Sequence, residues 1–169
     1  AMEGKEPNFK RILFPELIRE VSEIVAPAME AKNLSLIADV KPGFVYGDRE
    51  LLGSVFINLL DNAAKASQSG KRIWITGYPE EGFYLASVQD EGMGVKKEEL
   101  SRLTEAFYMV DKSRSRKEGG AGLGLALCKK ILDLHKAAWQ MESEPGEGMK
   151  ITVLFRIPKR KRNSRSEQS

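Results

Sequence analysis

Apolar side chains recur every three or four residues in three long stretches of the chain, which predicts three amphipathic helices. Pro15 suits the first turn of the first helix, and Asp48 suits the N-cap of the second. The helices are expected at residues 15–33, 49–67 and 122–135, with a shorter helical stretch at 98–103.

Between these helices the pattern changes to alternating or continuous apolar runs of strand length. Proline and glycine separate four of the runs at 79–82 and 145–148, where we expect two hairpin turns. Strands are expected at residues 34–40, 44–46, 72–78, 83–89, 138–142 and 149–157. Helices mixed with hairpins favour an α+β fold, a two-layer sandwich.

The length of 169 residues suits one domain, and 41% hydrophobic residues suffice for a core. No run of about 18 apolar residues and no secretory leader is present, so we expect no membrane span in this chain. Cys128 is the single cysteine, which excludes an internal disulfide and fits a cytoplasmic location. We expect residues 1–11 to be a linker or cloning remnant, 12–158 the folded domain, and 159–169 a basic, disordered tail.

The formal net charge of +3 arises in that tail, which holds five of the 27 basic residues and one of the 24 acidic residues. The remainder of the chain therefore carries 22 basic and 23 acidic residues and is close to neutral. A nucleic-acid partner is not expected for such a surface.

Polar residues occupy one face of the helix expected at 49–67. Asn58, Asp61, Asn62 and Lys65 are separated by three or four positions, so they lie together on that face. Asparagine is a poor helix former, so the presence of two asparagines within this helix needs an explanation. Amide oxygens can ligate Mg²⁺ or its waters, and a lysine one turn away can bind phosphate. The alternative is a solvated face with one buried hydrogen bond.

An acidic residue and two glycines follow the strand expected at 83–89. Gly92 and Gly94 let a flat ligand approach the backbone, and the Asp90 carboxylate can accept a hydrogen bond from an exocyclic amine. The alternative is a tight turn closed by the aspartate side chain.

A glycine-rich run, residues 119–126, leads directly into the last helix. Free N–H groups and the positive end of the helix dipole make such a start a phosphate cradle, although a flexible hinge is the alternative. The preceding loop supplies the cations Lys112, Arg114, Arg116 and Lys117. The P-loop, the dinucleotide-binding and the protein-kinase motifs are all absent, so a bound nucleotide would need another cradle.

In this order the motifs resemble the histidine-kinase branch of the ATPase superfamily that also contains type II topoisomerases, heat-shock chaperone ATPases and mismatch-repair ATPases. Residues 48–65, with Asp48, Leu51, Leu52 and the run 58–65, resemble the N box of that family. Residues 90–94 resemble its G1 box, 107–108 its F box and 120–125 its G2 box. The resemblance implies a Bergerat-type ATP-binding fold, in which three helices cover one face of a mixed five-stranded sheet.

The same resemblance implies ATP and Mg²⁺ as cofactors, with Asn62 as the metal ligand and residues 110–119 as an ATP lid. It assigns catalytic roles to Asn58, Lys65 and Arg114, and it places Asn62, Asp90 and Gly122 around one cavity. The nucleotide-binding residues would be Asn58, Asn62, Lys65, Asp90, Gly92, Gly94, Phe107, Lys112, Arg114, Gly120, Gly122, Leu123, Gly124 and Leu125.

Asn58 stands where the ATP-hydrolysing relatives carry a glutamate that activates water. An amide cannot take that proton, so transfer to a protein acceptor is favoured over hydrolysis. The expected function is the catalytic domain of a sensor histidine kinase. The alternatives are a serine kinase of the anti-sigma type and a degenerate ATP-binding scaffold, because Met109 and Ala66 replace an arginine and an aromatic residue that are frequent in the family.

The resemblance also implies the partners. The acceptor histidine would lie on a separate upstream dimerisation domain, and a response regulator would receive the phosphoryl group. The full-length protein would be a membrane-anchored homodimer, whereas this chain would be a monomer that binds ATP without autophosphorylation. His135 is the only histidine and is expected to cap its helix or to lie at the surface.

Overall fold

A mixed sheet of five strands forms one layer of the molecule in the computed structural model, which describes residues 6–100 and 121–158, without the side chains of 121–123. β2 and β4 run parallel, whereas the other neighbours in the sheet are antiparallel. In order across the sheet the strands are β2 (Ser35–Val40), β4 (Arg72–Glu80), β5 (Phe83–Asp90), β7 (Gly148–Arg156) and β6 (Ala138–Glu144).

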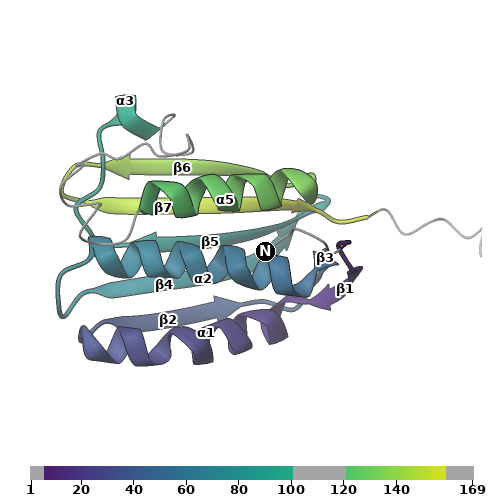
Figure 1. Cartoon of the computed structure of the whole chain (residues 1–169), viewed down its shortest axis with the longest axis horizontal. Helices are drawn as coiled ribbons and strands as arrows, with labels where there is room; N and C mark the ends of the chain where they lie inside the picture. The colour runs from purple at the N-terminus through teal and green to yellow at the C-terminus, as the bar shows by residue number, and fades with distance from the viewer. Residues whose placement is uncertain (1–5, 101–120, 159–169) are drawn as a thin grey trace, which may run out of the picture.

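Three long helices form the second layer and cover one face of this sheet (Figure 1). They are α1 (Phe14–Ala31), α2 (Arg49–Ala66) and α5 (Ala121–Leu134), and a short α3 (Lys97–Leu100) contacts β6. The predicted α+β sandwich, a five-stranded sheet under three helices, is confirmed. None of the described helices is long and apolar enough to cross a membrane.

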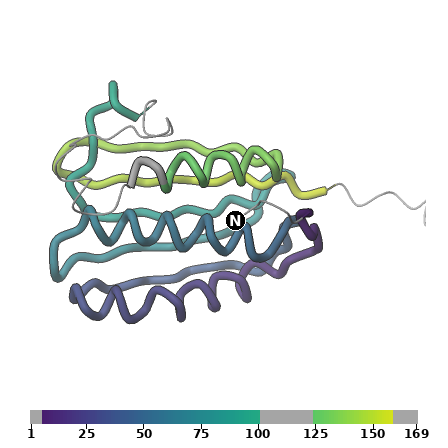
Figure 2. Tube along the Cα trace, in the orientation of Figure 1, coloured from purple at the N-terminus to yellow at the C-terminus, as the bar shows by residue number. Residues whose placement is uncertain are grey.

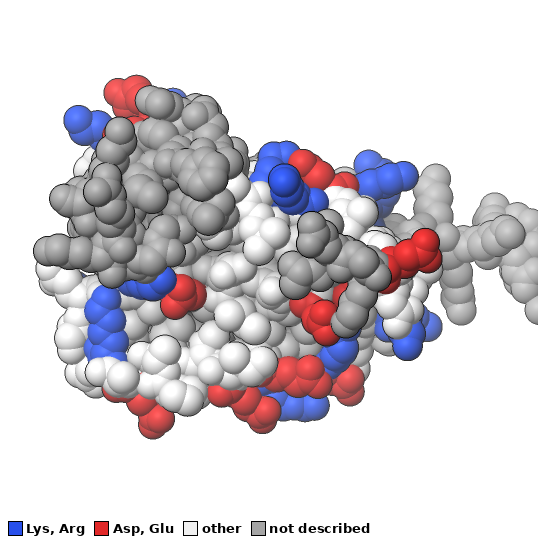
Figure 3. All heavy atoms as spheres, in the orientation of Figure 1, with Lys and Arg blue, Asp and Glu red and all other residues white. Residues whose placement is uncertain are grey.

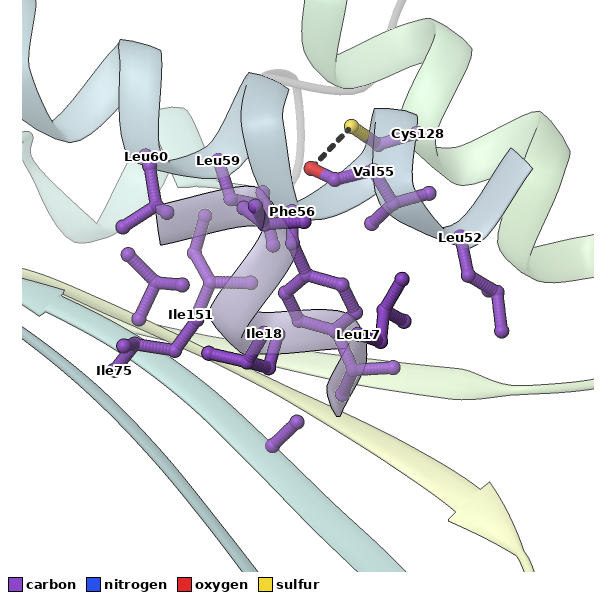
Figure 4. Close-up of a cluster of buried hydrophobic side chains, with 14 of the residues drawn as sticks. Leu17, Ile18, Leu52, Val55, Phe56, Leu59, Leu60, Ile75, Cys128 and Ile151 are labelled. Atoms are coloured by element: carbon purple, nitrogen blue, oxygen red, sulfur yellow. Dashed lines mark hydrogen bonds between the residues drawn. The ribbon is translucent and has the colours of Figure 1, made fainter. Parts of the chain in front are cut away.

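The core fills the space between the two layers, and α2 lies over the middle of it (Figure 4). Phe14 of α1 lies edge-on to Phe56 of α2, with ring centroids 5.3 Å apart, and 4.9 Å from the Tyr84 ring of β5. The Tyr84 hydroxyl donates a 2.6 Å hydrogen bond to the Lys41 carbonyl, and burial raises the pKa of this phenol to about 12. Burial of three large rings in one place contributes strongly to stability.

A second, two-stranded sheet was not expected from the sequence. β1 (Phe9–Leu13) pairs antiparallel with β3 (Phe44–Asp48) in the register Phe9 with Asp48. β1 therefore begins inside the stretch 1–11 that was expected to be a linker. Lys10 and Arg11 are adjacent, exposed residues, and only Ile12 is buried. The sequence of this strand therefore lacks the alternation of apolar and polar residues that marks a strand. In Figure 2 this purple strand and the yellow end of β7 lie at the same end of the sandwich.

The two predicted hairpins are present. Glu81 and Gly82 both have positive φ and form the two-residue turn between β4 and β5, in which Glu80 pairs with Phe83. The short helix predicted at 98–103 is observed at Lys97–Leu100, and the positions after 100 lie outside the described residues.

Candidate nucleotide site

The polar face of α2 lies at the carboxyl-terminal half of that helix. Asn58, Asp61, Asn62 and Lys65 are all half-buried, so this is not a freely solvated face. The Asn62 Nδ2 atom is buried and has no hydrogen-bond partner among the described residues. An unpaired buried amide is costly, and it leaves a donor available to a ligand. The Lys65 ammonium pairs with the Asp61 carboxylate at 3.0 Å, a bond for which a phosphate would compete.

The first turns of α5 lie against α2. A Cβ built on Gly124 would be 3.9 Å from the Asn58 Oδ1 atom, which brings the expected phosphate cradle to the expected metal helix. Further along α5, the Cys128 thiol donates a 3.7 Å hydrogen bond to the Val55 carbonyl of α2 (Figure 4). Burial raises the pKa of this thiol to about 12, which outweighs the opposing hydrogen bond with Asn58. Cys128 is therefore an inert core residue.

Asp90 is the last residue of β5 and is 7% exposed. Its Oδ1 atom accepts hydrogen bonds from the Gly92 N–H at 2.8 Å and the Met149 N–H at 3.1 Å. Burial raises the pKa of this carboxyl, and the two N–H donors oppose that shift. A buried carboxylate gains from one further donor, and the exocyclic amine of a base can supply it.

The turn after Asp90 contacts the carboxyl-terminal end of α2. A Cβ on Gly92 would lie 2.5 Å from the Ala66 carbonyl oxygen, so only glycine fits there. The Met93 N–H donates to that same carbonyl at 3.3 Å. The expected adenine site and the expected metal helix are therefore in direct contact.

Glu91 fixes the turn from the other side. Its carboxylate accepts from the Arg72 backbone N–H at 2.9 Å and pairs with the Arg72 guanidinium at 2.8 Å. These hydrogen bonds lower the pKa of Glu91 to about 2. At Gly94, with φ of +65°, a side chain would collide with the Glu144 carbonyl. Contacts within the protein thus explain why both positions of the turn are glycine. A bound ligand is not needed to explain them.

The other predicted site residues fall into two groups. Phe107, Lys112, Arg114 and Gly120 lie outside the described residues, as does the expected lid. Gly122, Leu123, Gly124 and Leu125 lie in the first turns of α5, and Leu125 is buried in the core, so only its backbone could face a ligand. The expected common cavity of Asn62, Asp90 and Gly122 stays a prediction.

Two contributors to this region were missed. The sequence motifs mark Ala66 only by its lack of an aromatic ring, yet its carbonyl joins α2 to the turn. Lys32, from the end of α1, donates to the Ala64 carbonyl at 2.7 Å. No local pattern could have revealed a contact between positions 32 residues apart.

Elsewhere the surface offers a different kind of hollow. A groove of about 850 Å³ lies between the N-terminal segment, α1 and α2, and none of the predicted site residues lines it. On the helix-bearing face, Lys and Arg are interspersed with Asp and Glu around the rim, and uncharged surface lies between them (Figure 3).

The chain belongs to the family described as histidine kinase-, DNA gyrase B- and HSP90-like ATPases, whose sequence model matches residues 47–161. Within that family it is an ATP-binding catalytic domain of the histidine-kinase type, as the similar proteins indicate. The sensor histidine kinase YkoH of Bacillus subtilis (strain 168) is 34% identical over 90% of this chain and 33% of its own length. The phosphate regulon sensor protein PhoR of Pseudomonas aeruginosa is 40% identical over 77% of this chain and 30% of its own length.

Solved structures agree with this assignment. The mycobacterial sensor histidine kinase MprB has a TM-score of 0.78 and 26% identity, over 88% of this chain and 97% of that chain. Full-length ShkA in complex with AMPPNP has a TM-score of 0.77 and 25% identity, over 89% of this chain and 31% of that chain. The present chain spans about a third of the length of the curated relatives it matches.

Proposed function

We propose that this chain binds Mg·ATP where the turn after β5 meets the carboxyl-terminal end of α2. The observation that carries the proposal is the buried Asp90 carboxylate, held by Gly92 and Met149 beside that helix end. In this arrangement Asp90 accepts a hydrogen bond from the adenine amine. The complex of the related ShkA with AMPPNP supports an adenine nucleotide as the ligand.

The metal would be held by Asn62, with the remaining ligands supplied by water and phosphate oxygens. An amide oxygen is among the oxygen ligands that Mg²⁺ accepts in proteins. When bound, Mg²⁺ neutralises phosphate charge. Asn58 and Lys65 lie on the same face of α2, and the start of α5 offers backbone N–H groups to the phosphates.

Transfer of the γ-phosphoryl group to a histidine of a separate dimerisation domain is the reaction we propose. Phosphoryl transfer asks a protein mainly for alignment and charge neutralisation, which amides, cations and backbone N–H groups supply. Asn58 cannot act as a general base toward water, so hydrolysis is disfavoured. Because this chain lacks a histidine in the context of a dimerisation helix, it should bind ATP and remain unphosphorylated by itself.

The full-length protein would pass the phosphoryl group to a response regulator. We propose a homodimeric, membrane-anchored sensor whose catalytic domain, this chain, is cytoplasmic. The names of the relatives, which are sensor kinases or sensor proteins, support the sensor role.

The test is to mix the purified chain with a separately produced dimerisation domain and γ-labelled ATP. We expect phosphate on the second domain that is lost in acid and retained in base, and much less of it with Asp90→Asn at an ATP concentration near the dissociation constant. Acid-stable label would instead support a serine kinase. ATP binding without any label would support a scaffold that has lost transfer.

A further inference from the structure

Lys32 lies where α1 ends and reaches across to α2. Its ammonium donates to the Ala64 carbonyl at 2.7 Å and to the Lys65 carbonyl at 3.4 Å, and its side chain is half-buried. None of the salt bridges within residues 6–100 and 121–158 involves Lys32. Its positive charge is thus directed to backbone oxygens and not to a carboxylate.

These oxygens belong to the last turn of α2, where a helix has carbonyls without helical partners. Ser67 donates hydrogen bonds to two of these carbonyls. Its Oγ–H donates to the Ala63 oxygen at 2.7 Å, and its N–H donates to the Ala64 oxygen at 3.2 Å. The Met93 N–H donates to the Ala66 oxygen, and the Lys32 ammonium donates to the Lys65 oxygen. The helix end is therefore fixed from three separate segments.

This end of α2 presents an electrostatic difficulty for a nucleotide. The carboxyl-terminal end of a helix carries partial negative charge, and Asn62 and Lys65 would bring a polyphosphate close to it. A cation bound to the terminal carbonyls offsets that charge without occupying the ligand position. The same contact joins the last turn to the end of α1, while the Met93 N–H joins that turn to the segment after Asp90.

We infer that Lys32 is a positioning residue for nucleotide binding: its ammonium holds the last turn of α2 and offsets the negative helix end beside the phosphates. The inference rests on the proposed function, because it assumes that a nucleotide binds there. Loss of the ammonium should therefore weaken binding more strongly as the ligand carries more phosphates.

The experiment measures dissociation constants of the whole chain for adenosine, ADP and ATP with Mg²⁺, at a temperature well below unfolding. Lys32→Met should weaken ATP binding about tenfold, the scale of a hydrogen bond to a charged group, and adenosine binding less than about threefold. Lys32→Arg should restore ATP binding to within about threefold, because a guanidinium keeps both charge and donors. Lys41→Met is the control, since Lys41 is exposed and pairs with Asp39 at 3.3 Å.

A purely structural role would weaken all three ligands equally, and that result would overturn the inference, as would ATP binding by Lys32→Met within threefold of the unaltered chain. If Lys32→Met does not fold, Lys32→Gln decides in the same way, because it keeps a donor and removes the charge. Failure of the unaltered chain to bind ATP would instead refute the proposed function.

Discussion

The two ends of α2 are built differently. At the amino end Asp48 caps the helix through the Leu51 N–H at 3.0 Å and also accepts from the Asn8 N–H at 2.8 Å. The Asp48 N–H donates to the His135 Nε2 atom at 3.0 Å. At the carboxyl end the buried Asn62 Nδ2 atom has no partner among the described residues.

The amino end is thus closed by contacts within the protein, and it joins α2 to β1 and α5. The His135 Nδ1 atom bonds to the Ile131 carbonyl at 2.8 Å near the end of α5, so the expected capping role is confirmed. The alternative of a surface position is wrong, because the ring is half-buried and stacked on Phe9 with centroids 4.7 Å apart. The carboxyl-terminal half instead retains an unpaired buried amide, and the last turn contacts the segment that follows the buried Asp90. This difference indicates that one end serves stability and the other serves a ligand.

The largest expected effect is on the ligand end. Asp90→Asn should weaken nucleotide binding by about 1.5–3 kcal/mol, because a charged acceptor for the adenine amine becomes neutral. Its amide oxygen can still accept from Gly92 and Met149, so the melting temperature should change little. Isothermal titration with Mg·ATP measures the affinity, and Asp48→Asn is the matched control that should bind as the unaltered chain does. Undiminished binding by Asp90→Asn would show that adenine does not bind at this turn.

The next effect belongs to the closed end. Asp48→Ala should lower the free energy of unfolding by about 1–2 kcal/mol, because the N-cap and the bond to Asn8 are lost together. Affinity for nucleotide, measured well below the melting temperature, should stay unchanged. Denaturant unfolding gives the first quantity. A variant with full stability and impaired binding would show that the roles of the two ends are reversed.

Asn62→Ala should have a smaller effect of the opposite sign. The substitution removes a buried unpaired donor and replaces a poor helix former, so the chain without ligand should gain about 0.5–1 kcal/mol of stability. The same variant should lose the increase in ATP affinity that Mg²⁺ produces. Titrations with and without Mg²⁺ measure this, and a destabilised variant that still responds to Mg²⁺ would contradict the assignment.

The smallest effect is a pH dependence at the closed end. Burial lowers the pKa of His135 below 6.5, opposed by its hydrogen bond to Ile131 and by the charge of Asp48. As pH falls through about 6.5 the unfolded chain takes up this proton before the folded chain, so stability declines with falling pH in that range. His135→Gln should flatten the slope between about pH 7 and 5.5, as measured by urea unfolding. An unchanged slope would show that another group titrates there.

The long periodic helices could be predicted closely: 49–67 was expected and Arg49–Ala66 is observed. β1 could not, because Lys10 and Arg11 occupy two of its five positions and its partner β3 lies more than thirty residues away. The contact of His135 with Asp48 and that of Lys32 with Ala64 could not be predicted for the same reason, since the partners are distant in sequence. Local patterns identify elements and motifs, whereas the contacts that join them depend on the tertiary fold.

For the site, the spacing of Asn58, Asn62 and Lys65 correctly predicted a shared face of α2. The turn at Asp90 was also found, but the reason for its glycines was not. Gly92 makes room for the Ala66 carbonyl, a contact between segments that no motif in either segment reveals.

The most direct test of the difference between the two ends is an amide spectrum of the ¹⁵N-labelled chain, recorded with increasing Mg·AMPPNP. The account predicts the largest shifts at the Gly92 and Met149 N–H groups, which bond to Asp90, and little change at the Asp48 and Leu51 N–H groups. Shifts concentrated at Asp48 and Leu51, with Gly92 and Met149 unmoved, would contradict it.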